Sequence, residues 1–228
     1  MKKIGILGGI SSASTLQYYK ALHEMFYQQQ KNYYYPEMAI ESLNFQDFTD
    51  LENENRMDEY RHYILVGLEN LKRAGADFAI MAANSPHSVL EEIRPAAPLP
   101  ILSIVDAVGQ NAQSLGLKRL LLTGIRYTMQ RTFYQQRLQK YGIEVITPTS
   151  NEQDEINEII FSELVLDVVT SASKKRFLQI IDGHPADGVV LGCTELPQLI
   201  SQNDVSVPLL NSLQLHCAAA LKYAIEKE

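Results

Sequence analysis

Four short runs of the chain are almost wholly apolar, and each is followed by a stretch with helical spacing. The runs are KKIGIL (residues 2–7), ADFAIM (76–81), RLLLTG (119–124) and DGVVLG (187–192). A strand that is apolar on both faces must be covered on both faces, which is typical of a parallel sheet between two layers of helices. The alternation therefore predicts the α/β class, with mostly parallel sheets flanked by helices. Helices are expected over residues 14–30, 88–94, 129–141 and roughly 213–227.

The second half of the chain repeats the pattern of the first half. ADFAIMAANS (76–85) aligns with ADGVVLGCTE (186–195), and the starts of the two halves align at a slightly different shift. The matched pairs are Asp77 with Asp187, Ala83 with Cys193, Gly8 with Gly124 and Tyr18 with Tyr134. Because the two aligned stretches occur in the same order in both halves, the sequence favours two pseudo-symmetric lobes. We expect the first lobe to comprise residues 1–97 with 208–228 returning to it, and the second to comprise residues 98–207.

The charge balance argues against a nucleic-acid partner. Lys and Arg number 20 against 27 acidic residues, for a formal net charge of −7, and no basic cluster offsets this.

The chain starts on MKKIGILGG without a charged and then apolar leader, and no apolar run approaches the ~18 residues of a membrane helix. We therefore expect a cytoplasmic protein with no membrane partner. Its 46% hydrophobic content is enough to fill a core.

Cys193 is the most reactive candidate side chain. It follows the run DGVVLG, and ligands of parallel α/β sheets bind at the carboxyl ends of strands. A thiol that faces a helix N-terminus there would have a lowered pKa and a usable thiolate. A buried thiol without chemistry is an equally good explanation of the position alone. Cys217 lies in the Ala- and Leu-rich stretch LHCAAALKYAI and is expected to fill the core.

The end of the first run offers an anion site rather than a dinucleotide site. GILGGISSAS places a tight turn at Gly8 and Gly9, and Ser11, Ser12 and Ser14 can cap the following helix. The spacing G-x-x-G-G differs from the G-x-G-x-x-G of dinucleotide-binding turns. The five histidines have no metal-ligand spacing, so no metal is expected. His87 and His216 remain candidates for orienting a site.

The motifs GILGGISSAST, NSPH (84–87), RYTM (126–129), EINEIIFSEL (155–164) and GCTE (192–195) resemble those of the aspartate/glutamate racemase family. This family needs no pyridoxal phosphate, so the resemblance implies no cofactor. It implies two α/β lobes with a small amino acid or carboxylate in the cleft between them, and a homodimer. It also implies two cysteines, one per lobe, on opposite sides of the substrate Cα.

The resemblance carries over to this chain with one central departure. Cys193 matches the second-lobe cysteine, whereas the first-lobe position is Ala83, which has no proton to exchange. Two further departures, Ile125 and Val165, leave open whether the substrate has a second carboxylate. The residues implied to bind the substrate are Ile10, Ser11, Asn84, Ser85, Thr128, Thr194 and Glu195, with His87 as an orienting residue.

Three functions fit these residues. The first is a racemase in which Cys193 is the single catalytic thiol, and Ser85, a bound water or His87 serves the other face of the substrate. The second is a decarboxylase of a malonate-type acid, because one thiol suffices to protonate an enolate from one face. The third is a protein that binds small acids without turnover.

Overall fold

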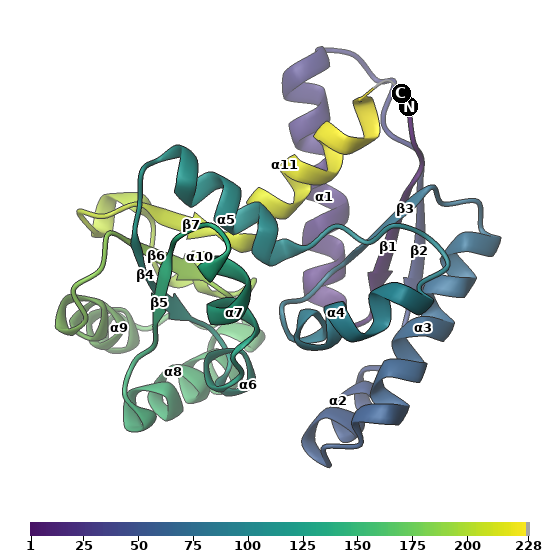
Figure 1. The fold of residues 1–228 in the computed structure, drawn as a ribbon. Helices are drawn as coiled ribbons and strands as arrows, with labels where there is room; N and C mark the ends of the chain where they lie inside the picture. The colour runs from purple at the N-terminus through teal and green to yellow at the C-terminus, as the bar shows by residue number, and fades with distance from the viewer. Residues whose placement is uncertain (227–228) are drawn as a thin grey trace. The chain divides into compact units, whose positions relative to one another are not determined.

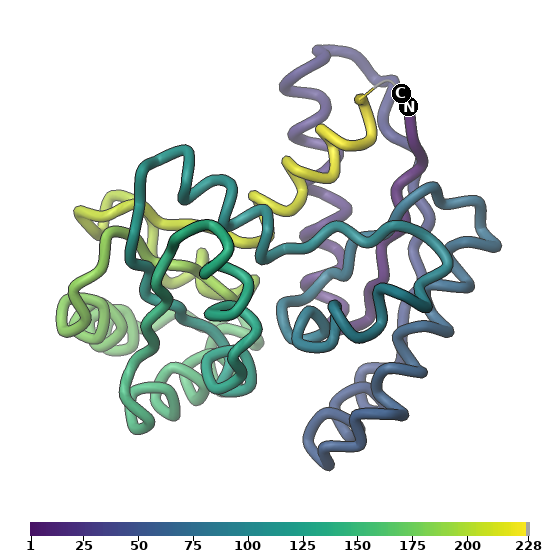
Figure 2. The backbone as a smooth tube through the Cα atoms, in the orientation of Figure 1, coloured from purple at the N-terminus to yellow at the C-terminus, as the bar shows by residue number. Residues whose placement is uncertain are grey.

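The computed structural model describes residues 1–226 and divides the chain into two compact units (Figures 1 and 2). Unit 1 comprises Met1–Ile104 together with the C-terminal segment from His216, and unit 2 comprises Val105–Leu215. No helix among the described residues is long and apolar enough to cross a membrane.

Unit 1 is built on a three-stranded parallel sheet in the order β2-β1-β3. Its strands are β1 (Ile4–Gly8), β2 (Met38–Ser42) and β3 (Phe78–Met81). Its longer helices are α1 (Ser12–Gln30), α2 (Phe45–Asn53), α3 (Met57–Arg73) and most of α11 (Ser212–Ile225). Short helices follow β3, namely the 3₁₀ helix η1 (Ser85–Val89), α4 (Leu90–Ile93) and the 3₁₀ helix η2 (Arg94–Ala96).

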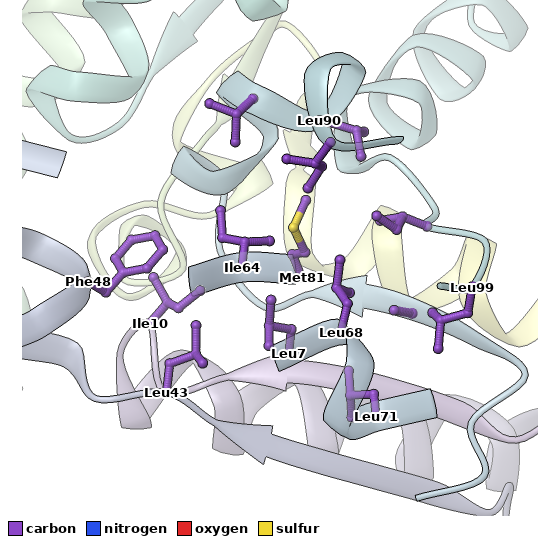
Figure 3. Packing of buried hydrophobic residues seen from close by; sticks show 14 of the residues in the cluster. Leu7, Ile10, Leu43, Phe48, Ile64, Leu68, Leu71, Met81, Leu90 and Leu99 are labelled. Carbon is purple, nitrogen blue, oxygen red and sulfur yellow. The ribbon is translucent and has the colours of Figure 1, made fainter. Parts of the chain in front are cut away.

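Helices cover both faces of this sheet. On one face, Leu7 and Met81 pack with Ile64 and Leu68 of α3 in a fully buried cluster (Figure 3). On the other face, Phe78 packs edge to face against Tyr223 of α11, with ring centroids 4.8 Å apart. Figure 1 shows α11 beside α1 on this face. Neighbouring residues of a strand thus face different helices, which explains why β1 and β3 are apolar throughout.

Unit 2 is built on a four-stranded parallel sheet in the order β5-β4-β6-β7. Its strands are β4 (Arg119–Thr123), β5 (Glu144–Ile146), β6 (Gly188–Leu191) and β7 (Leu209–Asn211). Its helices are α5 (Ile104–Ser114), α6 (Arg126–Gln130), α7 (Phe133–Gln139), α8 (Ser150–Ser162), α9 (Ser171–Gly183) and α10 (Leu196–Leu199). Two 3₁₀ helices, η3 (Leu164–Leu166) and η4 (Gln202–Asp204), complete it.

The core of unit 2 follows the same plan. Leu121 and Val189 of the central strands pack against α8 and α9, where Ile156 and Phe177 are fully buried. On the other side of the sheet, α5 and α7 are joined by the ion pair between Asp106 and Arg137 at 2.5 Å. The two parallel sheets flanked by helices confirm the expected α/β fold class.

The internal repeat is visible in the hydrogen bonds of the two sheets. The amide of Ala82 donates to the carbonyl of Leu7 at 2.8 Å, and in unit 2 the amide of Gly192 donates to the carbonyl of Thr123 at 2.8 Å. At the opposite ends of these strands, the Asp77 carboxylate accepts the amide of Lys3 and the Asp187 carboxylate accepts the amide of Arg119. The strand orders 2-1-3 and 5-4-6 also correspond.

The unit boundaries lie several residues away from the expected 97/98 and 207/208. The chain up to Ile104 stays with unit 1 because Leu102 and Pro100 form backbone hydrogen bonds with Ala79 of β3. Residues 208–215 belong to unit 2 because β7 pairs with β6 there. The last helix begins at Ser212, close to the expected start, and its expected end at Lys227 lies outside the described residues.

Candidate functional site

The carboxyl end of β6 carries a compact group of polar side chains. The Cys193 thiol donates to Oε2 of Glu195 at 2.9 Å, and the Thr194 hydroxyl donates to the same oxygen at 2.7 Å. Thr194 and Glu195 are buried, whereas Cys193 is partly exposed. One carboxylate oxygen therefore holds two neighbouring proton donors in place, and Cys193 is the only one of the three residues that is partly exposed.

The electrostatics of Cys193 differ from the sequence-based expectation. Burial and the neighbouring Glu195 carboxylate raise the pKa of the Cys193 thiol well above its usual value. The expected lowering of the pKa fails because burial disfavours the charged thiolate and the negative Glu195 carboxylate adds to this effect, whereas the backbone N–H groups of Thr194 and Glu195 oppose it only in part. Cys193 is therefore a protonated thiol at neutral pH, suited to giving a proton.

The second cysteine lies in the core, as the sequence suggested. Cys217 is fully buried on α11, and its sulfur lies 4.0 Å from the carbonyl of Tyr18. Burial raises the pKa of this thiol as well. Both its burial and its protonation make Cys217 chemically inert.

The turn after β4 lies against Gly192. A side chain at Gly192 would come within 2.6 Å of the Thr123 carbonyl oxygen and 3.5 Å of the Thr128 methyl group. Thr123 and Thr128 are both fully buried. The Thr123 hydroxyl donates to the carbonyl of Val190, whereas the Thr128 hydroxyl has no hydrogen-bond partner within the described part of the chain. A buried hydroxyl beside the cysteine turn, without a hydrogen-bond partner among the described residues, makes Thr128 a candidate ligand contact. Arg126 instead forms an exposed ion pair with Asp154.

The carboxyl end of β3 carries the corresponding turn of unit 1. Asn84, Ser85 and His87 are all at least 94% buried, and Ala83 is partly buried. Asn84 directly precedes η1, and the ring nitrogen Nδ1 of His87 lies 3.0 Å from the carbonyl oxygen of Ala83. The structure therefore gathers these four residues in one tight turn.

The turn after β1 packs against the β3 turn. Ser11 caps α1 by accepting the amide of Ser14 at 3.2 Å. The expected cap Ser14 instead donates its hydroxyl to the carbonyl of Ala82 at 2.5 Å, which ties α1 to the end of β3. The side chain of Ile10 lies in the hydrophobic core, so its side chain is not a substrate contact in this structure.

Gly9 makes the turn after β1 possible. Its φ of +78° is in the left-handed region, and a side chain there would collide with the backbone of Leu43. The amide of Gly9 donates to the Thr15 hydroxyl at 2.9 Å. The glycine pair noted in the sequence thus has a conformational role, as expected.

Apart from these turns, the described residues offer a cavity but no group of metal ligands. No group of three or more His, Cys, Asp or Glu side chains that could hold a metal ion occurs among residues 1–226. A cavity of about 600 Å³ opens between α6, α8 and α9. It is lined mainly by the paired charges of Arg126, Asp154, Glu155 and Arg176, and none of the predicted site residues lines it.

Replacing Glu195 by Gln is expected to speed alkylation of Cys193 by iodoacetamide at about pH 8. Removal of the negative neighbour lowers the pKa of the thiol, and each unit of lowering raises the thiolate fraction about tenfold. Mass spectrometry of the modified peptide measures the rate at Cys193 alone. Glu158→Gln, an exposed change on α8, is the matched control and should react like the original protein. Equal rates for Glu195→Gln and the original protein would contradict the assigned electrostatics.

Unfolding should depend on pH through His216. Burial and the neighbouring His87 lower the pKa of His216 to about 3 from 6.5, although its hydrogen bond to Leu102 opposes this. Below about pH 6.5 the unfolded chain binds a proton that the folded chain does not, so stability falls as pH falls, by up to about 1.4 kcal/mol per pH unit. Urea denaturation at about pH 7 and pH 5, above the range where carboxylates titrate, measures this loss. His216→Asn should reduce it, whereas exposed His62→Gln should leave it unchanged.

Comparison with known proteins identifies the family. A family model described as Asp/Glu/Hydantoin racemase matches residues 7–220. The broad specificity amino-acid racemase RacX of Bacillus subtilis (strain 168) is 27% identical over 214 residues, covering 92% of each chain. The crystal structure of an aspartate racemase homologue from Pyrococcus horikoshii OT3 has a TM-score of 0.88 at 36% identity, covering 99% of this chain and 100% of that one. The crystal structure of a candidate Asp/Glu racemase from Yersinia pestis has a TM-score of 0.92 at 31% identity, covering 99% of this chain and 100% of that one. The resemblance in the motifs is confirmed, and the chain belongs to the Asp/Glu/hydantoin racemase family.

Proposed function

We propose that this protein racemises an amino acid without pyridoxal phosphate, with Cys193 as its catalytic thiol. The observation that carries the proposal is the group at the end of β6, where the thiol of the partly exposed residue Cys193 donates to the carboxylate of the buried Glu195 at 2.9 Å. The family membership supports proton transfer at the Cα of an amino acid. The relatives' names support an amino acid with an aspartate-like or glutamate-like side chain as well as broader substrates.

In this proposal, Cys193 returns the proton to Cα. A base on the opposite face removes the Cα proton, and the S–H of Cys193 then donates its proton to the carbanion. The thiolate left behind lies beside the Glu195 carboxylate, where repulsion makes it a strong base. It can therefore remove the proton of the opposite enantiomer, or regain a proton from water. Thr194, which also donates to Glu195, keeps the carboxylate in place during both steps.

The turn after β3 supplies the proposed binding of the substrate carboxylate. Asn84 and Ser85 at the start of η1 offer uncharged donors, and Thr128 offers a buried free hydroxyl at the other turn. Such donors stabilise the charge that develops on the carboxylate as the Cα proton leaves. Ala83 has no proton to exchange, so the group that serves this face is Ser85, a bound water or His87. The opposed placement of Ala83 and Cys193 across one substrate stays a prediction, as do a homodimer and a cytoplasmic location.

A second function is favoured by the raised pKa of Cys193. A single protonated thiol, with alanine at the other position, suits the protonation of an enolate from one face. In decarboxylation of a malonate-type acid, the C–C bond to one carboxylate breaks, carbon dioxide leaves, and the electron pair remains as an enolate that takes one proton from the thiol. Binding of small acids without turnover is the third outcome to be tested.

Incubation in D₂O with single amino acids and, separately, with a disubstituted malonate separates these functions. A decarboxylase releases carbon dioxide from the malonate. Racemisation labels Cα and inverts it, exchange on one face labels without inversion, and a binding protein does neither. Cys193→Ser is expected to lower turnover by at least about 100-fold, since general acid–base groups contribute about 10² to 10⁴. Cys217→Ala in the core is the matched control and should keep the activity. Turnover that survives unchanged in Cys193→Ser would contradict the proposal.

Replacing Ala83 by Cys restores the thiol that the family motif has at this position. We expect the ratio of inverted to total labelled product to rise, because a second thiol then serves the other face of Cα. Chiral chromatography of the products measures this ratio. Ala97→Cys is the control, because Ala97 is also a partly buried alanine at the edge of the same core cluster. An unchanged ratio in Ala83→Cys would mean that Ala83 does not face the substrate Cα.

A further inference from the structure

His87 fixes the orientation of a peptide group in the β3 turn. Its Nδ1 lies 3.0 Å from the carbonyl oxygen of Ala83. A carbonyl only accepts, so Nδ1 carries the proton and donates it. The C=O of Ala83 and the N–H of Asn84 belong to one planar trans peptide group, so they point in opposite directions. Holding the oxygen on the side of His87 therefore directs the N–H of Asn84 to the other side.

His87 is in turn held by a second buried histidine. The rings of His87 and His216 meet edge to face, with centroids 5.5 Å apart and an interplanar angle of 74°. His216 is fully buried, and both of its nitrogens are engaged. Its Nε2 lies 3.1 Å from the carbonyl oxygen of Leu102, and its Nδ1 lies 3.0 Å from the hydroxyl of Tyr18. Because the carbonyl can only accept, His216 carries its proton on Nε2 and accepts the Tyr18 hydroxyl proton on Nδ1.

The contacts come from separate parts of unit 1. Tyr18 lies on α1 and His216 lies on α11. Leu102 lies in the segment whose backbone is hydrogen-bonded to Ala79 of β3. Burial keeps His216 neutral, so the ring stays in one tautomer and one orientation at working pH. A ring fixed at both nitrogens is a rigid support for the side chain that packs against it.

We propose that Tyr18, His216 and His87 form a positioning chain that holds the Ala83–Asn84 peptide with its N–H directed at the substrate carboxylate. This inference rests on the proposed function, since it assigns the Asn84 amide to carboxylate binding. Tyr18 and His216 do not touch the substrate in this arrangement. They fix the position of the His87 ring, and His87 in turn fixes the orientation of the Ala83–Asn84 peptide.

The two histidines should have opposite tautomers. Long-range ¹H–¹⁵N correlation spectra of the full chain at about pH 7.5 are expected to show the proton of His87 on Nδ1 and that of His216 on Nε2. The same tautomer in both rings would overturn the positioning chain. This measurement needs no substrate, so it tests the chain of contacts separately from the proposed reaction.

Variants of His216 test the effect on the peptide. His216→Phe keeps an aromatic ring against His87 but loses both hydrogen bonds. We expect the backbone amide resonance of Asn84 to shift, and kcat/KM for Cα proton exchange to fall about tenfold to 100-fold, as misplaced binding groups do. His216→Gln keeps a donor and an acceptor and should recover most of the lost kcat/KM. A purely structural role would lower the melting temperature of both variants without moving the Asn84 amide.

Controls keep the outcomes distinct. Tyr18→Phe removes one hydroxyl and gives the same readouts if His216→Phe fails to fold. His62→Gln on α3 is exposed and should change neither the Asn84 amide nor the exchange rate. An unmoved Asn84 amide in a folded His216→Phe or Tyr18→Phe protein overturns the inference. If no amino acid is turned over by the original protein while the Asn84 amide moves as expected, the proposed reaction fails and the positioning chain stands.

Discussion

The proposed chemistry depends on one contact, the hydrogen bond from the Cys193 thiol to the Glu195 carboxylate. A carboxylate next to a thiol stabilises S–H over S⁻, so the sulfur is a proton donor before it is a base. Once the proton is given away, the same repulsion drives the thiolate to take one back. A single side chain can thus serve both directions of a proton transfer, provided that the opposite face of the substrate has its own partner. In the proposed reaction Ala83 has no proton to exchange, so the identity of that partner is the central chemical question.

The scaffold explains why polar groups collect where they do. Each unit has a parallel sheet whose first and third strands end in buried turns, and corresponding backbone bonds join those ends at Ala82 and Gly192. In unit 1, Ser14 fastens α1 to the β3 end, and in unit 2 the hydroxyl of Ser212 donates to the carbonyl of Leu191 at the end of β6. Side chains from neighbouring elements therefore brace both strand ends. Such bracing holds the turn residues in one geometry, which proton transfer at a small substrate needs.

The sequence predicted the four apolar strands and both turns, and it missed features that depend on neighbours in space. β1, β3, β4 and β6 were predictable because helices cover both of their faces, which forces an apolar run. Strands β2, β5 and β7 were not, because most of their residues are partly or fully exposed, and β5 and β7 have only 3 residues each. The position of Cys193 at a strand end was also predictable from spacing. The sign of its pKa shift was not, because it depends first on how deeply the thiol is buried and then on where the Glu195 side chain turns. The contact between His87 and His216 likewise joins residues from distant parts of the chain.

Direct titration of Cys193 tests the central claim most closely. With cysteine labelled at ¹³Cβ, the NMR resonance of Cys193 can be followed from about pH 6 to about pH 11 and distinguished from the buried Cys217 by substitution of the latter. The account predicts that Cys193 stays a thiol beyond the pH at which an ordinary cysteine ionises. A midpoint at or below the ordinary value would contradict it and would make Cys193 a resting thiolate instead.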